Sequence, residues 1–327
     1  MNLLITGGAG YIGSHIAHLA LESGHDITVF DDLSTGFKNN IPKDANFIKG
    51  STTSTEDLLN LFNKYYFDGV IHLAASKAAG ESMIRPGKYS YNNIVGSINL
   101  INSCVKNNVK NFIFSSTAAI YGMPKYVPLD ETHPLEPLNY YGFTKLEVER
   151  NLRWYGQLKD FKYASLRYFN AAGYSSNFHL SELEKSPQNL IPKVMEVAIG
   201  IRKKIKIYGS DYNTEDGTGV RDYIHVVDLA IAHLKALNYI EKKTENLMLN
   251  LGTGKGYSVD EIVKNTNQIT NKNILVEYVG RRTGDPSVVI ANYDKAKKIL
   301  DWEPRNSSLN NILKTTWDIY KDKYNSI

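Results

Sequence analysis

The chain has 327 residues, of which 42% are hydrophobic and 22% charged, a composition ordinary for a globular protein with a large core. The net charge is only +4 and the single compact basic run, residues 202–204, falls where a helix is expected to end, which argues against a nucleic-acid partner. The single cysteine, Cys104, excludes an intramolecular disulfide and a cysteine metal cluster. Since no run approaches ~18 apolar residues and no basic leader precedes the first strand, we expect a cytoplasmic protein without membrane contact.

The first feature along the chain is a strand that runs into a glycine-rich turn. Residues 3–5 are apolar, and Gly7, Gly10 and Gly13 follow at every third position, with Tyr11 and Ile12 between the last two. In dinucleotide-binding proteins one such glycine permits the tight turn, another admits a pyrophosphate, and the last lets helix and strand pack closely. The apolar spacing of the next residues predicts a helix, whose N-terminus supplies N–H groups for a diphosphate.

An acidic residue ends the predicted second strand. Residues 26–30 are β-prone and lead to Asp31, which lies 18 residues after Gly13. A carboxylate there can accept hydrogen bonds from a ribose and would repel a 2′-phosphate, so Asp31 favours NAD over NADP. The alternative is an aspartate that only caps a helix. The polar loop at residues 32–36 would continue around the adenosine.

The remaining strands of the first lobe complete a sheet. We expect strands at residues 47–50, 69–75, 111–117 and 163–170, with helices around residues 58–62 and over 90–109. Strand 69–75 is apolar with small residues at its end, which is typical of a buried parallel strand beside a cofactor. Strand 111–117 ends in three hydroxyl residues. These elements predict the α/β class, with a Rossmann-type doubly wound parallel sheet that binds ligands at the carboxyl ends of its strands.

A tyrosine and a lysine share one face of the helix expected from residue 140. Tyr141 and Lys145 are one helical turn apart, so phenol and ammonium lie within reach of each other. A phenol is a poor base at neutral pH unless a positive charge stabilises the phenolate, and Lys145 can do that. Thr117 can hold a substrate hydroxyl while Tyr141 takes its proton. Because the chain has 22 tyrosines, the pair alone could be a chance match.

The regular alternation of predicted strands and helices ends at residues 174–189, which are polar and have no clear periodicity. This change predicts that the chain enters a second, smaller α/β lobe there. There we expect a helix over 190–201, a strand at 206–208, a glycine-rich acidic loop at 211–219 and a helix from residue 226. The strand at residues 247–252 would return to the main sheet. The predicted domains are therefore 1–173 for the cofactor, with a return of about 226–252, and 174–327 for the substrate.

Several motifs make the chain similar to a known family. Residues 6–13, 115–117 and 141–145 resemble the extended short-chain dehydrogenase/reductases. Residues 73–82, 166–170 and above all 214–226 look like those of the UDP-glucose 4-epimerases within that family, and the resemblance covers nearly the whole chain. It implies NAD-dependent 4-epimerisation of UDP-hexoses by transient oxidation at C4, rotation of the 4-keto sugar and return of the hydride. It also implies a homodimer.

The resemblance assigns roles residue by residue, with Tyr141 as base, Lys145 as its activator and Thr117 as hydroxyl partner. NAD would contact Gly7, Gly10, Tyr11, Ile12, Gly13, Asp31, Asp32, Leu33, Ser34, Thr35, Gly36, Ser51, Thr52, Leu73, Ala74, Ala75, Lys77, Asn92, Tyr141, Lys145 and Phe169. The UDP-sugar would contact Lys77, Thr117, Tyr141, Asn170, Asn189, Leu190, Arg221, Arg282, Asp285 and Val289. Both arginines would bind the diphosphate, which suits a planar, always charged guanidinium.

Three positions leave alternatives open. The family usually has an aspartate after the glycine at position 50, where it meets the adenine amino group, but this chain has Ser51 and Thr52. Adenine contact there stays open. Arg221 could form only a surface ion pair with the neighbouring Asp222, and Asn170 could be only a turn residue.

Two other functions compete with epimerisation. A nucleotide-sugar 4,6-dehydratase shares the fold, the cofactor and the tyrosine–lysine pair, but it places Asp-Glu after the strand-end threonine, where this chain has Ala118 and Ala119. Alanine transfers no proton, so elimination is disfavoured. A regulatory NAD-binding protein without catalysis would show a damaged catalytic set, whereas Thr117, Tyr141 and Lys145 are all present.

One residue bears on which hexoses fit. Val289 stands where family members specific for the plain hexoses carry a tyrosine that closes the pocket near the C2 substituent, whereas members that accept N-acetylated sugars carry a smaller residue. We therefore expect UDP-GlcNAc and UDP-GalNAc to be accepted as well. The alternative is that Val289 is only a strand residue. A register slip by one would bring in Val288, which is equally small.

Overall fold

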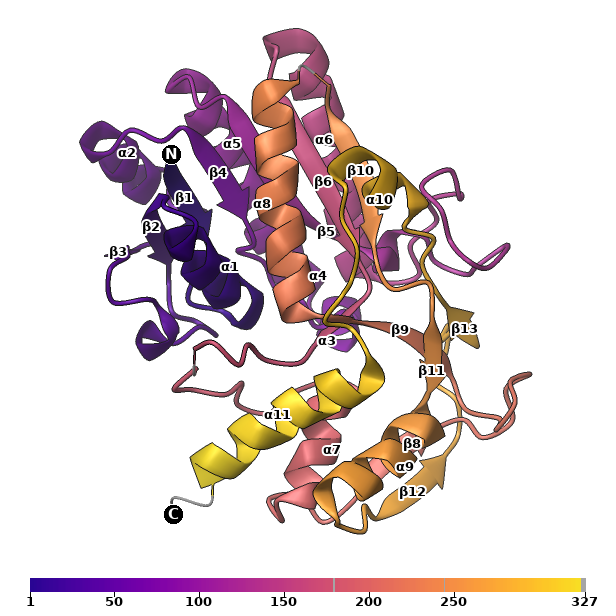
Figure 1. Cartoon of the computed structure of the whole chain (residues 1–327). Helices are drawn as coiled ribbons and strands as arrows, with labels where there is room; N and C mark the ends of the chain where they lie inside the picture. The colour runs from indigo at the N-terminus through magenta and orange to yellow at the C-terminus, as the bar shows by residue number, and fades with distance from the viewer. Residues whose placement is uncertain (179, 244, 325–327) are drawn as a thin grey trace.

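The computed structural model describes residues 1–178, 180–243 and 245–324, so positions 179, 244 and 325–327 of the predicted second lobe lie outside the described residues (Figure 1). The strands are β1 (Asn2–Thr6), β2 (Asp26–Asp31), β3 (Asn46–Lys49), β4 (Gly69–His72), β5 (Asn111–Thr117), β6 (Lys162–Tyr168), β7 (Asn170–Ala172), β8 (Ile205–Tyr208), β9 (Val220–His225), β10 (Leu247–Leu251), β11 (Gly256–Ser258), β12 (Val276–Val279) and β13 (Val288–Val289). The helices are α1 (Tyr11–Glu22), η1 (Lys38–Asn40), α2 (Thr55–Lys64), α3 (Ala79–Ile84), α4 (Pro86–Tyr89), η2 (Ser90–Val95), α5 (Gly96–Lys106), η3 (Ala118–Ile120), α6 (Tyr140–Lys159), α7 (Leu190–Ala198), α8 (Val226–Lys242), α9 (Val259–Thr270), α10 (Asp294–Leu300) and α11 (Leu309–Tyr324); η1 and η3 are 3₁₀ helices and η2 is a π-helix.

The main sheet of the described chain has seven parallel strands in the order β10-β6-β5-β4-β1-β2-β3. Strand order reverses beside β1, which has β2 on one side and β4 on the other. In such sheets the crevice outside the carboxyl ends at the reversal is where ligands bind. The predicted doubly wound parallel sheet is confirmed.

Helices cover both faces of this sheet because its strands are apolar on both sides (Figure 1). Leu3 and Ile5 of β1 belong to one core cluster with residues of α1 and α8. Leu4, between them, belongs to the opposite cluster, with residues of α2, α5 and α6. Successive side chains of β1 thus point to opposite faces of the sheet, and each face is covered by its own layer of helices.

The second lobe is built around β9. This strand pairs with β7, β11 and β13, while β8 pairs with β12 in a separate two-stranded sheet. Helices α7, α9 and α11 pack together on these strands around Ile191, Ile262 and Ile312 (Figure 1). The lobe therefore has a hydrophobic core of its own.

Several elements differ in extent from those predicted by the sequence. The predicted strand 69–75 ends at His72, so Leu73, Ala74 and Ala75 follow the strand. The predicted strand 163–170 is two strands, because β6 ends at Tyr168 and β7 begins at Asn170 in the other sheet. The predicted helix 90–109 starts as the π-helix η2 before it becomes α5. The predicted helix 190–201 ends at Ala198. Strand β10 lies beside β6, so the chain does re-enter the main sheet after the second lobe begins. Among the described helices, none has the length and apolarity needed to span a membrane.

Candidate active site

The glycine turn between β1 and α1 has the geometry of a phosphate-binding loop. Gly7 has a positive φ of 73°, and a Cβ there would lie 2.6 Å from the Ala74 backbone nitrogen. A Cβ at Gly13 would lie 2.2 Å from the Gly7 carbonyl oxygen, so the helix can approach the turn only with glycine. Gly10 is the N-cap of α1 and provides no side-chain cap, and the first turn has no acidic residue. The residues of this turn fit a diphosphate.

Asp31 ties the end of β2 to this turn. Its carboxylate accepts the N–H groups of Ala9 at 3.0 Å and Leu33 at 2.8 Å, and burial raises its pKa. The residue ends a strand and caps no helix, so that alternative is wrong. The loop that follows, Asp32 to Gly36, lies directly on the turn, since a Cβ at Gly36 would be 2.8 Å from Ala9.

Ser51 and Thr52 follow β3 at the same edge of the sheet. The Ser51 N–H donates to the Asp57 carboxylate at 2.9 Å, and the Ser51 hydroxyl pairs with Thr53 at 2.8 Å. Thr52 is buried against Gly96. A carboxylate thus does lie near this position, but it comes from α2 and is already bonded. Contact of Ser51 or Thr52 with adenine stays a prediction.

The chain after β4 passes the glycine turn and then reaches the second lobe. The N–H groups of Leu73 and Ala74 both donate to the Thr6 carbonyl, at 2.9 and 3.1 Å, and Ala75 follows them. Lys77 is exposed and forms an ion pair with Glu184 at 3.0 Å. Lys77 is therefore bound to the 174–189 segment.

Tyr141 and Thr117 meet at the carboxyl end of β5. Gly142 makes this possible, because a Cβ there would lie 2.5 Å from the Ala119 carbonyl oxygen. Burial raises the pKa of Tyr141, and hydrogen bonding to Thr117 lowers it. Burial therefore favours the protonated form of the phenol.

Lys145 lies one turn further along α6 and is 3% exposed. Its ammonium donates to the Ser115 carbonyl at 2.8 Å and lies 4.7 Å from the centre of the Phe114 ring. Burial lowers the pKa of Lys145 to about 7, against the opposing effect of Glu149. Burial has the largest effect on the pKa of both groups, so the expectation that Lys145 lowers the pKa of Tyr141 stays a prediction.

The predicted substrate residues of the second lobe fall into two groups. Arg221 on β9 forms an ion pair with Asp285 and also donates to the Val220 carbonyl at 2.8 Å. The alternative pair with Asp222 is wrong, since that carboxylate is fully buried and accepts backbone N–H groups, including that of Thr253 at 2.9 Å. Asn170 is not a turn residue but lies in β7, where its amide donates to the Asp222 carbonyl at 3.0 Å.

The second group surrounds the start of α7. Asn189 is the N-cap of this helix, makes no side-chain cap and is followed by Leu190. Arg282 stacks over the Tyr208 ring at 3.9 Å. Lys193, one turn after Asn189, has a pKa lowered by burial and then by the charge of Arg282. These basic groups and the free helix N-terminus suit an anion.

Val289 connects the two lobes. In β13 it lies opposite Arg221 of β9, and its side chain packs against the buried cluster that contains Phe169, Leu146 and Ala291. A predicted cofactor residue and a predicted sugar residue are therefore in one cluster.

Sequence reasoning missed several polar residues around Tyr141. Ser82, Asn93 and Thr144 are buried and hydrogen-bonded to the backbone or side chains of the predicted site. Asn93 directly follows Asn92, whose amide donates to the Ser76 hydroxyl at 3.0 Å. Ser82 and Asn93 bond to residues of α6 that are 59 and 51 positions away, so no local spacing marks them.

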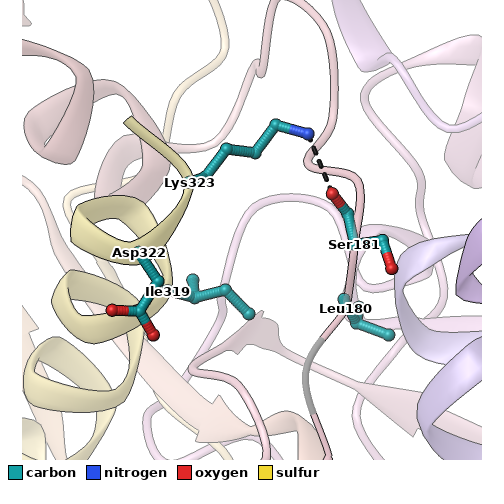
Figure 2. Close-up of a pocket in the computed structure, with 5 residues that line it drawn as sticks. All are labelled: Leu180, Ser181, Ile319, Asp322 and Lys323. Atoms are coloured by element: carbon teal, nitrogen blue, oxygen red, sulfur yellow. Dashed lines mark hydrogen bonds between the residues drawn. The ribbon is translucent and has the colours of Figure 1, made fainter. Parts of the chain in front are cut away.

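A cavity of about 400 Å³ lies elsewhere, between α11 and the 174–189 segment (Figure 2). Lys323 crosses it to donate to the Ser181 carbonyl at 2.9 Å. Leu180, Ile319 and Asp322 complete its lining. None of these five residues belongs to the predicted site.

Fold and site together define a dinucleotide-dependent enzyme with a tyrosine and a lysine at the end of the fifth strand. A family model described as "NAD dependent epimerase/dehydratase family" matches residues 3–252, and the chain belongs to this family. It is 41% identical over 322 residues to a UDP-glucose 4-epimerase of Halalkalibacterium halodurans, covering 98% of this chain and 96% of the relative.

Solved structures agree with this membership. The UDP-glucose 4-epimerase of Brucella ovis in complex with NAD has a TM-score of 0.94 and 39% identity, with 98% of each chain covered. The UDP-Glc/GlcNAc 4-epimerase of Campylobacter jejuni has a TM-score of 0.86 and 40% identity, covering 98% of this chain and 99% of that one.

The glycine turn generates a prediction about cofactor retention. Gly13→Ala should lose most of the bound NAD and lower the melting temperature, because backbone must move away from the added Cβ at a cost of ~1–3 kcal/mol. NAD released by heat from purified protein and a thermal melt measure both effects. Gly87→Ala is the matched control, since a Cβ there meets nothing within 4 Å. Full NAD content in Gly13→Ala would contradict this account of the turn.

Proposed function

We propose that this chain interconverts UDP-glucose and UDP-galactose by epimerisation at C4 with bound NAD. The observation that carries the proposal is the partly buried Tyr141 beside Thr117, at the same sheet edge as the glycine turn. Membership of the family and 41% identity to a curated UDP-glucose 4-epimerase over nearly the full length support it. A shared fold alone would not support the proposal, because proteins with one fold can have many functions.

Each catalytic group has a task that its surroundings permit. Tyr141 takes the proton of the C4 hydroxyl, while Thr117 holds that hydroxyl by a hydrogen bond. NAD, when bound, accepts the hydride from C4 and returns it to the 4-keto sugar. Tyr141 then gives its proton back, so that no net oxidation results.

The charge state of Lys145 matters for this step. Burial raises the pKa of Tyr141, so proton removal needs positive charge nearby. With its pKa near 7, Lys145 carries a fractional charge at neutral pH, and Glu149 favours the charged form. The ammonium is fixed to the Ser115 carbonyl, which holds the charge one turn from the phenol.

The second lobe anchors the nucleotide while the sugar turns. Epimerisation requires hydride to return to the opposite face of C4, so the sugar must rotate while UDP stays bound. Arg221 and Arg282 supply the charge for the diphosphate, Asn189 and Leu190 lie at the N-terminus of α7, and Lys193 adds a third cation near Arg282. Asp285 holds Arg221 in place.

The dehydratase alternative has no support at the site. Ala118 and Ala119 begin η3 directly after Thr117, and the Ala119 N–H donates to the Thr117 hydroxyl at 3.2 Å. Neither side chain can deliver or take a proton for water elimination. The relatives from Halalkalibacterium halodurans and Corynebacterium glutamicum, both UDP-glucose 4-epimerases, agree with this.

The decisive test is turnover of UDP-hexoses by purified protein. Wild-type protein should convert UDP-galactose to UDP-glucose, with NAD retained and no stoichiometric NADH released. Tyr141→Phe should keep fold and NAD but lose ~10²–10⁴-fold in kcat, because only the proton acceptor is removed. Chromatographic separation of the products measures this. Substantial turnover by Tyr141→Phe would refute the proposed base, and an inert wild-type protein would refute the function.

We further propose that the enzyme accepts the N-acetylated pair, UDP-GlcNAc and UDP-GalNAc. Val289 packs against the Phe169 cluster and lies in register with Arg221, while strand alternation turns Val288 to the other face, which supports the choice of Val289 over Val288. Its small side chain leaves room for an N-acetyl group. The relative from Campylobacter jejuni, named for both UDP-Glc and UDP-GlcNAc, is 40% identical.

Substitution at this position should change specificity. Val289→Tyr is expected to depress kcat/KM for the N-acetylated pair at least tenfold and to spare the plain hexoses, since a ring blocks only the larger substituent. Parallel assays of all four UDP-sugars measure the ratio. Val288→Tyr, on the opposite face, is the matched control. Wild-type protein inert toward UDP-GlcNAc would contradict the proposal.

We also propose that the enzyme is cytoplasmic and that it forms a homodimer. The interface of the homodimer would consist of η2, α5 and α6. Large apolar side chains are exposed on η2, with Tyr91 54% exposed, and on α6, with Trp154 62% and Leu158 69% exposed, while α5 follows η2 directly. Patches of this kind mark interfaces.

Sedimentation equilibrium tests the assembly. Wild-type protein should have about twice the 36.8 kDa chain mass, and the double substitution of Trp154 and Leu158 to glutamate should shift it to monomer, because two charges would be buried unpaired. Substitution of exposed Tyr66, which lies on no helix of this group, is the control. A monomeric wild-type protein would refute the homodimer.

A further inference from the structure

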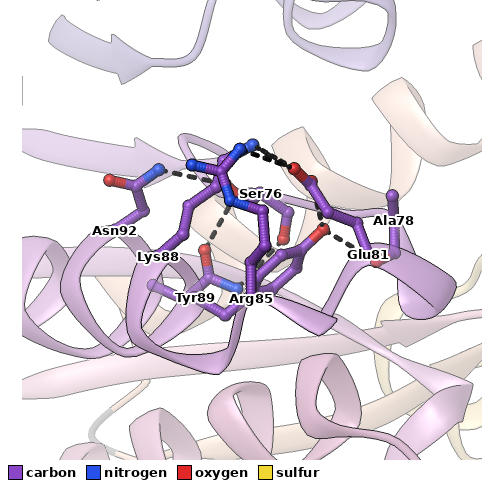
Figure 3. A network of polar contacts seen from close by, with 8 residues as sticks. Ser76, Ala78, Glu81, Arg85, Lys88, Tyr89 and Asn92 are labelled. Atoms are coloured by element: carbon purple, nitrogen blue, oxygen red, sulfur yellow. Dashed lines mark hydrogen bonds and ion pairs between the residues drawn. The ribbon is translucent and has the colours of Figure 1, made fainter. Parts of the chain in front are cut away.

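The segment between β4 and α4 carries Lys77 and is fixed by a dense polar network (Figure 3). The Ser76 N–H donates to the Asn93 amide oxygen at 2.8 Å, and its carbonyl accepts the Asn93 amide at 3.0 Å. The Ser76 hydroxyl accepts the Asn92 amide at 3.0 Å. Three polar groups of one residue are thus held by two consecutive asparagines.

The π-helical turn explains how two neighbours reach the same residue. In an α-helix, consecutive side chains diverge by about 100°. Asn92 and Asn93 lie within η2, where the wider π-turn places both amides on Ser76. Such turns frequently occur at functional sites.

The far end of the segment is held by Tyr89 and Glu81. The Tyr89 hydroxyl donates to the Ala78 carbonyl at 2.7 Å and to the Glu81 carboxylate at 3.0 Å. Lys88 also donates to this carboxylate at 2.8 Å, and Arg85 lies 3.6 Å from it (Figure 3). Helices α3 and α4 are therefore joined at several points.

Ser82 connects this rigid segment to the proposed base. Its hydroxyl accepts the backbone N–H of Tyr141 itself at 3.0 Å and donates to the Ala79 carbonyl at 2.6 Å. The residue is 0% exposed, so its hydroxyl is committed to these two partners. The N–H of Tyr141 belongs to the first turn of α6 and has no partner within the helix.

A second connection runs parallel to the first. The Asn93 amide donates to the Thr144 hydroxyl at 3.0 Å, and this hydroxyl donates to the Tyr141 carbonyl at 2.8 Å. Both peptide groups that flank the Tyr141 side chain are thereby tied to the segment that begins at Ser76. Asn93 and Thr144 are 1% and 0% exposed.

We propose that Ser82 is a positioning residue for Tyr141, which sets the phenol against Thr117 by holding the Tyr141 backbone to the segment that carries Lys77. The inference rests on the proposed function, in which Tyr141 is the base. Buried polar groups are costly unless they are bonded, so this arrangement fixes one geometry. A misplacement of about 1 Å far from the chemistry can cost up to ~10²-fold in rate.

A purely structural role for Ser82, as a helix cap, is the competing explanation. Asn139 provides the matched comparison, because its side chain accepts the N–H of Gly142 at 2.9 Å on the same helical turn. A cap of either kind contributes ~1 kcal/mol of stability. Ser82→Ala and Asn139→Ala should therefore lower the melting temperature similarly.

The experiment compares these two variants with wild-type holoenzyme. Ser82→Ala should lower kcat for UDP-galactose about tenfold. KM should stay within twofold of wild type because the arginines proposed to anchor UDP lie on the other lobe, and NAD content should stay within twofold because Ser82 bonds only Ala79 and Tyr141 and not the glycine turn. Hydrogen bonding to Thr117 lowers the pKa of Tyr141, so weakening that contact should raise this pKa and move the acidic limb of the kcat profile to higher pH. Asn139→Ala should change neither the profile nor kcat more than twofold.

Ser82→Cys has a side chain of similar volume but a weaker hydrogen-bond acceptor for the Tyr141 N–H, so its kcat should lie between those of wild type and Ser82→Ala. This variant provides the test if Ser82→Ala does not fold. Equal kcat losses in Ser82→Ala and Asn139→Ala, with an unmoved pH profile, would overturn the positioning role. Wild-type protein without epimerase activity would instead overturn the proposed function, and the two failures are thus distinguishable.

Discussion

The close contact between the first turn of α6 and the carboxyl end of β5 is the constraint on which the site depends. Only the missing side chain at Gly142 allows it, since a Cβ would lie 2.5 Å from the Ala119 carbonyl oxygen. At this separation Tyr141 reaches Thr117 and Lys145 reaches the Ser115 carbonyl. A helix displaced by one methyl group would separate both pairs at once.

This contact also sets the protonation behaviour of the site. The same burial that brings Tyr141 and Lys145 together opposes charge on either group, which raises one pKa and lowers the other. Neutral forms of both groups are therefore favoured; a further positive charge would favour the phenolate of Tyr141, whereas Glu149 favours the ammonium of Lys145. The pKa values of the two groups are thus set by the residues around them. Glu149, which pairs with Arg167 in the core, lies one helical turn from Lys145 and provides a counter-charge for it.

Local features of the sequence predicted the parts of this structure that depend on local chemistry. These parts include the glycine turn, the acid that ends β2 and the tyrosine–lysine pair, because each depends on residues close together in the sequence. Together with the predicted strands they indicated the doubly wound sheet. Long-range contacts could not be predicted that way. The pairing of Lys77 with Glu184, and of Ser82 with Tyr141, joins segments 107 and 59 positions apart. The break after Tyr168 was missed because a single residue separates β6 from β7, so residues 163–170 were predicted as one strand, although β6 and β7 enter different sheets.

The single residue between β6 and β7 has a consequence for the design of truncated versions. Phe169 is the whole link between the two sheets, and after β9 the chain returns through α8 and β10 to complete the first. A gene cut at residue 173 would remove α8 and leave Ile16, Ala20 and other apolar residues of α1 without the helix that covers them. Each lobe has its own core, yet the polypeptide crosses between them too often to be divided. Shortened versions should therefore be sought at the termini or in exposed loops.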